Sequence, residues 1–191
     1  MGRSLAPRYR ARDLVNAPTL VSLLRFPLAA LFPFVHESAP ASLVVLAAAA
    51  LTDVVDGAIA RRFGLATPTG AVVDGVSDKV FAFAVLATLV TKGVLTPLDV
   101  ALLGTREIGE LPLVVWLAVS PEARKRKVDD RANLLGKAAT VLQFAAIALA
   151  ITGSHFKTPL VVATVVVGAA AAASYWRRAL LARQRGSSDG S

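Results

Sequence analysis

Six long apolar stretches dominate this chain of 191 residues. A helix that crosses the hydrocarbon core of a membrane needs about 20 apolar residues. The stretches lie at approximately Thr19–Val35, Ala41–Ile59, Ala71–Val90, Leu98–Val119, Leu134–Ile151 and Pro159–Trp176. Because a bilayer offers the backbone no hydrogen-bond partners, such segments must form helices. The chain is therefore predicted to be an all-α polytopic membrane protein with six transmembrane helices.

The overall composition supports a membrane protein. Hydrophobic residues make up 55% of the chain and charged residues only 18%, whereas a soluble domain typically has about 25% charged residues. The chain contains no cysteine, which excludes a disulfide framework and a thiolate metal site. We expect a single membrane domain over residues 1–185, opening with a cytoplasmic juxtamembrane segment over residues 1–17, and a disordered tail over residues 186–191.

The net charge of +8 would suit a nucleic-acid partner, but the distribution of the cations indicates a membrane topology instead. Fifteen Lys and Arg residues lie before the first span or after the second, fourth and sixth spans, and only Lys92 and Lys157 lie in loops on the opposite side. Positive residues concentrate on the cytoplasmic side of membrane proteins. Both termini are therefore predicted to be cytoplasmic, with membrane lipids and not nucleic acid as partners.

Four aspartates interrupt the apolar sequence between the second and third spans. Asp53 and Asp56 are three residues apart near the end of one helix, and Asp74 and Asp78 are four apart near the start of the next. Each pair therefore shares one helix face. The connection between the two helices is short, so they are expected to be antiparallel neighbours whose carboxylates converge. A carboxylate inside a spanning helix costs roughly 2.5–3.5 kcal/mol, so this group needs partners or a bound cation.

Oxygen ligands without histidine or cysteine favour Mg²⁺ or Mn²⁺ over zinc. Two such ions sharing bridging carboxylates would suit phosphoryl chemistry. Gly57 and Gly70 have no side chain, so a backbone or a nucleotide can approach closely beside the metals. Arg61 offers a fork-shaped donor for a phosphate. The alternative is that the aspartates cap helices or pair with Arg61 and Lys79.

The spacing of these residues resembles the complete motif of the CDP-alcohol phosphotransferase family. That motif is D-x2-D-G-x2-A-R-x8-G-x3-D-x3-D, and its fixed positions here are Asp53, Asp56, Gly57, Ala60, Arg61, Gly70, Asp74 and Asp78. The resemblance implies a six-helix enzyme of the cell (inner) membrane, a homodimer, with an active site facing the cytoplasm. Such enzymes transfer a phosphatidyl group or a smaller phosphoalcohol from a CDP-linked donor to an alcohol and release CMP.

The resemblance also implies a role for each motif residue. Asp53, Asp56 and Asp74 would hold the metals, while Asp78 would be both a ligand and the base that deprotonates the acceptor hydroxyl. The CDP part of the donor would contact Gly57, Arg61 and Thr67. Gly75 departs from the proline that many members carry after the third aspartate, which leaves the ligands in place but puts substrate detail in doubt.

Shorter patterns resemble the bacterial phosphatidylglycerophosphate synthase branch of the family. Residues 16–25 are similar to its N-x-P-x-x-L-T-x-x-R segment, which makes Asn16 and Thr19 candidates for the nucleotide pocket. The competing interpretation is that one of them only caps a helix. An R-E-I pattern lies at residues 106–108 and a G-K-x2-T-x2-Q pattern at residues 136–143. These patterns favour a glycerol-phosphate acceptor.

An anionic acceptor in a membrane cavity needs fixed cations, and Arg106, Arg131 and Lys137 are the candidates. Arg106 and Glu110 are four residues apart on one helix face, so the alternative for Arg106 is an internal ion pair. The predicted reaction transfers a phosphatidyl group from CDP-diacylglycerol to glycerol 3-phosphate. The alternative acceptors are phosphatidylglycerol, which would give cardiolipin, and inositol phosphate. A transporter is a remote alternative, because all four aspartates cluster toward one side of the membrane.

Overall fold

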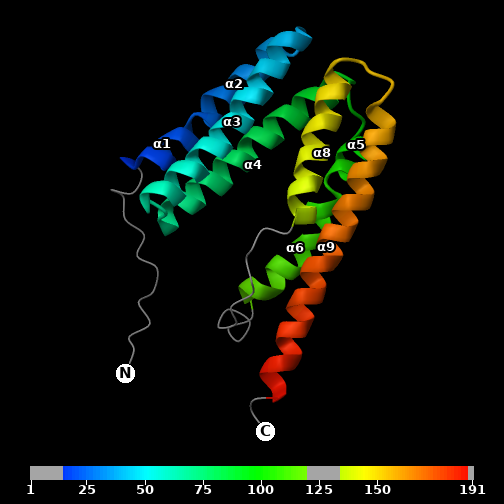
Figure 1. Ribbon diagram of the computed structural model, residues 1–191. Coiled ribbons are helices and arrows are strands. Elements are labelled where there is room, and N and C mark those ends of the chain that lie inside the picture. The colour runs from blue at the N-terminus through cyan, green and yellow to red at the C-terminus, as the bar shows by residue number, and fades with distance from the viewer. Residues whose placement is uncertain (1–14, 120–133, 189–191) are drawn as a thin grey trace. The chain divides into compact units, whose positions relative to one another are not determined.

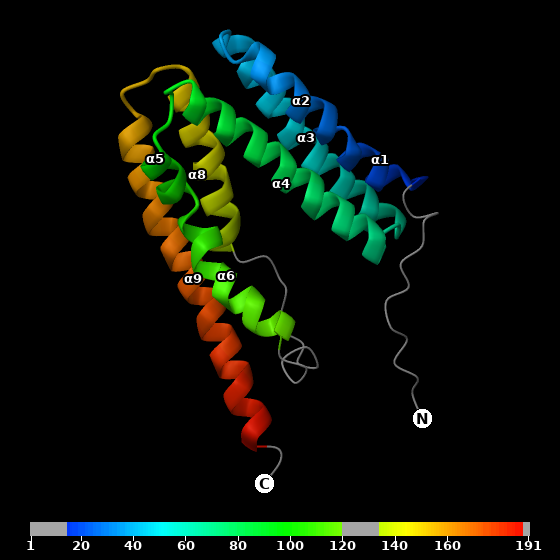
Figure 2. The ribbon, with the colours of Figure 1, turned by 180° about the vertical axis from the view of Figure 1, so that it is seen from behind.

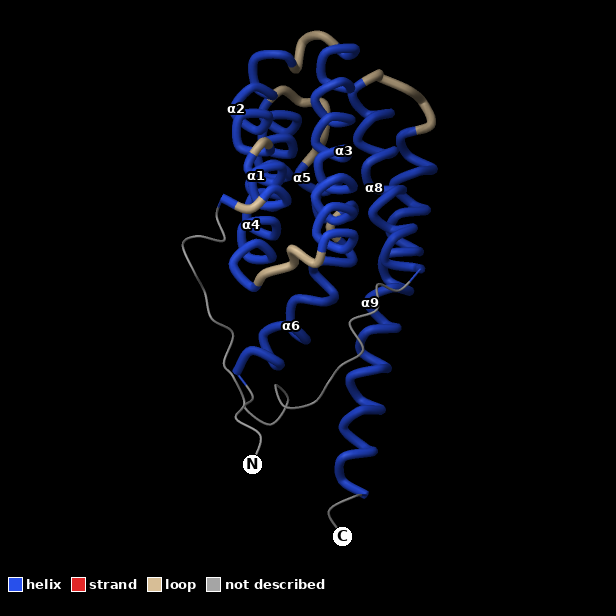
Figure 3. The backbone as a smooth tube through the Cα atoms, turned by 60° about the vertical axis from the view of Figure 1, so that its left-hand side comes forward, coloured by secondary structure: helices blue, strands red, loops and turns tan. Residues whose placement is uncertain are grey.

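The computed structural model describes residues 15–119 and 134–188 of the chain. Within these ranges the chain forms helices and loops without any strand (Figure 3). The prediction of an all-α protein is therefore confirmed. Four helical stretches are long and apolar enough to cross a membrane: Ala17–Val35, Ala39–Phe63, Leu134–Ile151 and Lys157–Leu180.

The chain divides into two compact units, Met1–Val94 and Leu95–Ser191. The first unit contains α1 (Ala17–Leu23), α2 (Arg25–Val35), α3 (Ala39–Phe63) and α4 (Pro68–Thr91). Within this unit α1 and α2 pack against both α3 and α4 (Figure 1). The N-terminal helices therefore contact both of the helices that carry the aspartates.

Helix ends in the first unit follow ordinary capping chemistry. The Thr67 hydroxyl accepts a hydrogen bond from the Gly70 N–H at 3.0 Å and so caps the start of α4, where Pro68 is the first helical residue. Gly64 ends α3 in the left-handed conformation with a φ of 64°, which glycine adopts without strain. The connection between α3 and α4 is therefore only residues 64–67, as short as predicted.

The second unit contains α5 (Pro97–Leu103), α6 (Thr105–Val119), α8 (Leu134–Ile151) and α9 (Lys157–Ser188). Helix α9 packs against α5, α6 and α8 and is the common partner in this unit (Figure 2). Small residues allow close approach between α6 and α9. A Cβ atom built on Gly109 would lie 2.8 Å from the Ala172 Cβ, and one built on Gly168 would lie 3.3 Å from the Arg106 backbone nitrogen.

Two predicted spans are each divided into two helices. The expected helix over Leu98–Val119 is interrupted at Gly104, which separates α5 from α6. The expected helix over Thr19–Val35 is interrupted at Leu24, which separates α1 from α2. Pro27 explains the second break, since it has no N–H to donate to the carbonyl four residues earlier, that of Leu23. The first of these spans is still one of the four described stretches that are long and apolar enough to cross a membrane, whereas Leu98–Val119 is not among them.

Candidate active site

Three of the four predicted aspartates come together in the first unit. Asp53 and Asp56 lie in the second half of α3, and Asp74 lies in the second turn of α4. One carboxylate oxygen from each of them lies within 4.8 Å of the other two. Asp56 is 5% exposed as a residue, whereas the side chains of Asp53 and Asp74 are open to solvent. Helices α1 and α2 contact both α3 and α4, and the carboxylates of the two aspartate helices come together beside them.

A buried arginine joins these three carboxylates. The Arg25 side chain is 1% exposed, and its Nη1 donates to Asp74 Oδ1 at 2.6 Å. Its Nη2 lies 3.0 Å from Asp53 Oδ1 and 3.1 Å from Asp56 Oδ2. The Ser22 hydroxyl lies 2.7 Å from the same Asp56 oxygen and 3.5 Å from Asp74 Oδ1. The break between α1 and α2 therefore lies directly beside the aspartate cluster.

Asp78 is outside the group of three. It lies one turn further along α4, a displacement of about 6 Å along the helix axis, and its residue is exposed. Four carboxylates were predicted to converge, and the structure brings three of them together. The role of Asp78 as a base stays a prediction.

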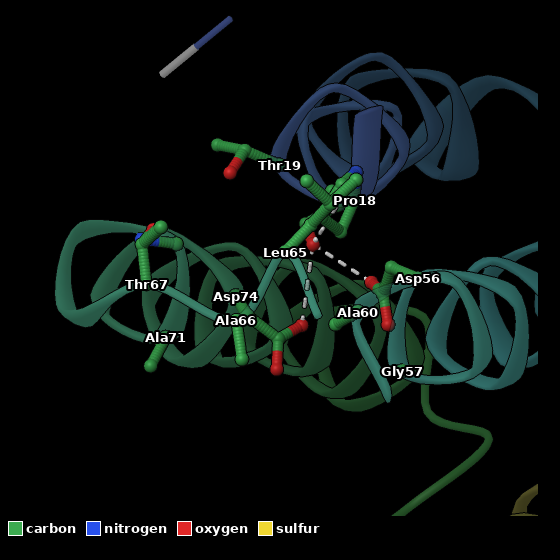
Figure 4. Close-up of a pocket in the computed structure, with 12 residues that line it drawn as sticks. Pro18, Thr19, Asp56, Gly57, Ala60, Leu65, Ala66, Thr67, Ala71 and Asp74 are labelled. Atoms are coloured by element: carbon green, nitrogen blue, oxygen red, sulfur yellow. Dashed lines mark hydrogen bonds between the residues drawn. The ribbon is translucent and has the colours of Figure 1, made fainter. Parts of the chain in front are cut away.

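A cavity of about 170 Å³ opens beside the aspartates. Its walls come from the start of α1, the end of α3, the connection and the start of α4 (Figure 4). The residues lining it are Pro18, Thr19, Ser22, Asp56, Gly57, Ala60, Leu65, Ala66, Thr67, Gly70, Ala71 and Asp74. Asp56 and Asp74 contribute carboxylates to this lining, while Thr19 and Thr67 contribute hydroxyl groups. Four of the predicted donor-binding residues, Thr19, Gly57, Thr67 and Gly70, thus share one cavity.

Two glycines in the cavity wall lie where a side chain would collide with a polar group. A Cβ atom on Gly70 would lie 3.1 Å from the Thr19 Oγ1 and 3.1 Å from the Thr67 Oγ1. A Cβ atom on Gly57 would lie 3.0 Å from the Arg61 Nη1, because the Arg61 side chain folds back over the preceding turn. Both glycines therefore leave space for polar side chains of the chain itself, and close approach of a nucleotide stays a prediction.

The other two donor-binding candidates lie at the edge of this arrangement. Arg61 is exposed near the end of α3. Asn16 occupies the N-cap position of α1, but its side chain makes no capping hydrogen bond. Capping through its side chain, the competing interpretation for Asn16, is therefore absent in this structure.

The predicted acceptor-binding residues belong to the second unit. Arg106 Nη1 donates to the Gly136 carbonyl at 2.9 Å and to the Thr140 hydroxyl at 2.7 Å, which ties α6 to α8. Its Nη2 lies 2.9 Å from Glu107, and its Nε faces Glu110 at 3.7 Å. The internal pairing proposed as the alternative for Arg106 is thus present.

Lys137 is exposed near the start of α8. Arg131 lies outside the described residues.

Sequence reasoning gave no role to Arg25 or to Ser22. A signal for Arg25 was available, because an arginine within an apolar span needs an anionic partner, and the next two spans carry the aspartates. The signal for Ser22 is weaker: it stands at the threonine position of the N-x-P-x-x-L-T-x-x-R pattern. A serine in an apolar helix commonly bonds to its own backbone, and this one lies 3.2 Å from the Pro18 carbonyl as well.

The chemistry of the three aspartates fits a hard divalent cation. The donors are carboxylate oxygens from two rigid helices, and one oxygen of each carboxylate is not engaged by Arg25. Magnesium and manganese prefer this ligand type. The cluster also carries more anionic than cationic charge, with three carboxylates against one guanidinium. A cation therefore finds both ligands and a favourable charge here.

Comparison with known proteins identifies the family. The family profile described as CDP-alcohol phosphatidyltransferase matches residues 14–176. A Mycobacterium tuberculosis protein named probable phosphatidylglycerophosphate synthase is 37% identical over 170 residues, which is 86% of this chain and 77% of that protein.

Two further relatives are informative. An Aquifex aeolicus CDP-diacylglycerol–glycerol-3-phosphate 3-phosphatidyltransferase is 34% identical over 66% of this chain and 70% of its own length. A rice (Oryza sativa subsp. japonica) protein named cardiolipin synthase (CMP-forming) is 38% identical over 51% of this chain, but only 30% of that protein is covered. The profile match spans most of the chain and includes every position of the aspartate motif. The chain belongs to the CDP-alcohol phosphatidyltransferase family.

Proposed function

We propose that this protein is a phosphatidyltransferase that moves a phosphatidyl group from CDP-diacylglycerol to glycerol 3-phosphate, giving phosphatidylglycerophosphate and CMP. The observation that carries the proposal is the cavity whose lining includes Asp56 and Asp74. The family supplies the reaction type, and the names of the mycobacterial and Aquifex relatives support the acceptor.

Asp53, Asp56 and Asp74 would hold a divalent cation, Mg²⁺ or Mn²⁺, with two ions as the preferred number. When bound, these ions neutralise the donor pyrophosphate and the departing CMP. Asp78 would accept the proton of the acceptor hydroxyl, since it is a carboxylate one turn from Asp74 and is not tied up by Arg25. Its exposure leaves it accessible to an acceptor.

The CDP portion of the donor would occupy the cavity. Gly57 and Gly70 allow its close approach, the hydroxyl of Thr67 offers polar contact, and Arg61 would pair with a phosphate from the rim. Asn16 and Thr19 would complete this side of the pocket. The apolar rims of α3 and α4, where Val54 and Val72 are exposed, suit a donor whose acyl chains stay in the bilayer.

For the acceptor phosphate we propose Arg106, Arg131 and Lys137. Glycerol 3-phosphate carries about two negative charges, so it needs fixed cations more than phosphatidylglycerol does. Arg106 would have to share its guanidinium between the acceptor and its present partners. Lys137 is exposed and needs no such exchange.

We further propose that residues 1–185 form one domain with six membrane spans. The protein would be a homodimer in the cell membrane, with its termini and its active site facing the cytoplasm. The four apolar helices and the 24-residue helix α4 support multiple spans. The residues of α5 and α6 would form the remaining span. The asymmetry of the positive charges supports the orientation.

The proposal is tested with purified protein, CDP-diacylglycerol, Mg²⁺ and a panel of acceptors, with lipid products identified by mass. The expected products are phosphatidylglycerophosphate and CMP in equal amounts, with glycerol 3-phosphate as the preferred acceptor. If phosphatidylglycerol is converted to cardiolipin and glycerol 3-phosphate is ignored, the acceptor assignment is wrong, in favour of the activity named for the rice relative.

A further inference from the structure

One buried arginine, Arg25, contacts all three aspartates of the cluster. The proposed reaction assigns no role to it. We infer that Arg25 is the built-in counter-ion of the metal site: it holds the three aspartates together without metal and weakens their affinity for a divalent cation. The inference rests on the metal site proposed above. It concerns how that site is tuned, and its test separates the two.

The contacts of Arg25 leave room for a cation. It engages Oδ1 of Asp53, Oδ2 of Asp56 and Oδ1 of Asp74, which is one oxygen of each carboxylate. The second oxygen of each carboxylate is not used by the guanidinium. A metal ion that binds through those second oxygens would leave Arg25 in place. The planar fork of an arginine suits this arrangement, because its donors point toward several carboxylates at once.

Arg25 is not placed to bind the substrate. Its side chain is 1% exposed, and it does not line the cavity in which Asp56 and Asp74 take part. Arg61, by contrast, is exposed beside Gly57 at the cavity. The two arginines thus have different positions: Arg61 can reach a phosphate, and Arg25 lies behind the carboxylates that would hold the metal.

Charge decides what Arg25 does to metal binding. Three carboxylates and one guanidinium sum to two negative charges, whereas the carboxylates alone would carry three. A fixed positive charge next to the ligands repels a divalent cation, and this repulsion is strong where water is partly excluded. Removing the charge should therefore tighten metal binding. It should also destabilise the metal-free protein, because neighbouring carboxylates would then repel one another without compensation.

A purely structural role for Arg25 predicts the opposite sign. If the guanidinium only kept the carboxylates in position, its loss would scatter the ligands and weaken metal binding. The direction of the change in metal affinity therefore distinguishes a counter-ion from a scaffold. A measurement of activity alone would not, since both roles predict a slower enzyme.

The test is a Mn²⁺ titration of the full-length protein in detergent micelles, following free Mn²⁺ by electron paramagnetic resonance. The variants are Arg25→Gln, which removes the charge, and Arg25→Lys, which keeps it. Arg62→Gln is the matched control, because it removes one positive charge from an exposed position at the end of α3. Thermal unfolding is followed with and without Mn²⁺.

We expect Arg25→Gln to bind Mn²⁺ about tenfold more tightly than the wild type. Its Tm should be lower without metal, and Mn²⁺ should raise it by more than in the wild type. Arg25→Lys and Arg62→Gln should bind Mn²⁺ within about threefold of the wild type, because the charge is retained in the first and remote in the second.

Equal or weaker Mn²⁺ binding by Arg25→Gln would overturn the counter-ion inference. If Arg25→Gln does not fold, Arg25→Lys decides alone: affinity near that of the wild type supports the inference, and a loss of about tenfold or more contradicts it. Failure of the wild type itself to bind Mn²⁺ would instead remove the proposed metal site, and the counter-ion inference with it.

Discussion

Each unit of this protein places an arginine among carboxylates, and the two arrangements differ in origin and in charge. In the first unit Arg25 pairs with aspartates from two other helices, 28 to 49 residues away along the chain. In the second unit Arg106 pairs with Glu107 and Glu110 of its own helix. The first arrangement exists only in the folded unit, whereas the second forms as soon as α6 forms.

The charge balance separates the two clusters further. Arg25 is outnumbered three to one by carboxylates, and the side chains of Asp53 and Asp74 still reach solvent, at 62% and 43% exposure. Arg106 also donates to a carbonyl and a hydroxyl of α8, so part of its hydrogen-bonding capacity fastens two helices together. The first cluster is suited to recruit a cation, and the second to hold the helices of its unit. The following predictions test this difference.

The largest effect should come from removing a carboxylate of the first cluster. Asp56→Asn takes away the buried charged ligand, and we expect kcat/KM to fall by at least about 10³-fold, beyond the 10–100-fold typical of groups that only support a ligand. Glu110→Gln is the matched change in the second unit and should lower kcat/KM by less than about tenfold. Steady-state CMP release measures both. Equal losses in the two variants would remove the distinction between the clusters.

Asp78 should matter for proton transfer but not for donor binding. We expect Asp78→Asn to lower kcat by about 10²–10³-fold, in the lower range for loss of a general base, while the affinity for CDP-diacylglycerol stays near that of the wild type. Single-turnover kinetics together with donor-binding titrations measure the two quantities. A parallel loss of donor binding would make Asp78 a ligand and not a base.

In the second cluster, Arg106 is also the proposed contact of the acceptor phosphate. If it also receives the acceptor phosphate, Arg106→Gln should raise KM for glycerol 3-phosphate about tenfold and leave KM for CDP-diacylglycerol unchanged. Arg177→Gln, at an exposed position of α9, is the control. A lower Tm with both KM values unchanged would show that Arg106 only ties α6 to α8.

The smallest effect expected is at the cavity wall. Gly70→Ala places a Cβ 3.1 Å from two hydroxyl oxygens, and crowding of about 1 kcal/mol corresponds to a roughly fivefold rise in KM for CDP-diacylglycerol. Gly75→Ala on the same helix meets nothing within 4 Å and should leave KM unchanged. If both variants behave alike, the donor does not depend on the space beside Gly70.

Residue pattern alone was enough to predict the helices that carry the aspartates. Their apolar length, the spacing of the aspartates and the short connection are local signals, and from these we predicted two antiparallel helices with converging carboxylates. Hydropathy did not locate the breaks at Leu24 and Gly104, although polar or charged residues follow both of them directly. Hydropathy measures how well a segment suits the membrane and does not detect a missing backbone hydrogen bond.

The interior of the site was harder to predict because it depends on tertiary contacts. Arg25 lies in the first apolar span, and only packing of α2 against α3 and α4 shows which carboxylates it meets. Asp78 is outside the group of three because of how far α3 and α4 are offset along their axes. The spacing of residues within one helix does not determine this offset. Sequence spacing therefore predicted which residues share a face, while the actual partners required the folded unit.

Metal dependence of the wild-type protein tests the central claim most directly. Protein stripped with EDTA and transferred to metal-free buffer should release no CMP from CDP-diacylglycerol and glycerol 3-phosphate, because the carboxylates beside the cavity then lack the cation that would neutralise the pyrophosphate. Stepwise addition of Mg²⁺ or Mn²⁺ should restore turnover, and Ca²⁺ serves as a comparison cation. Full turnover in the stripped protein, unchanged by added metal, would contradict the account.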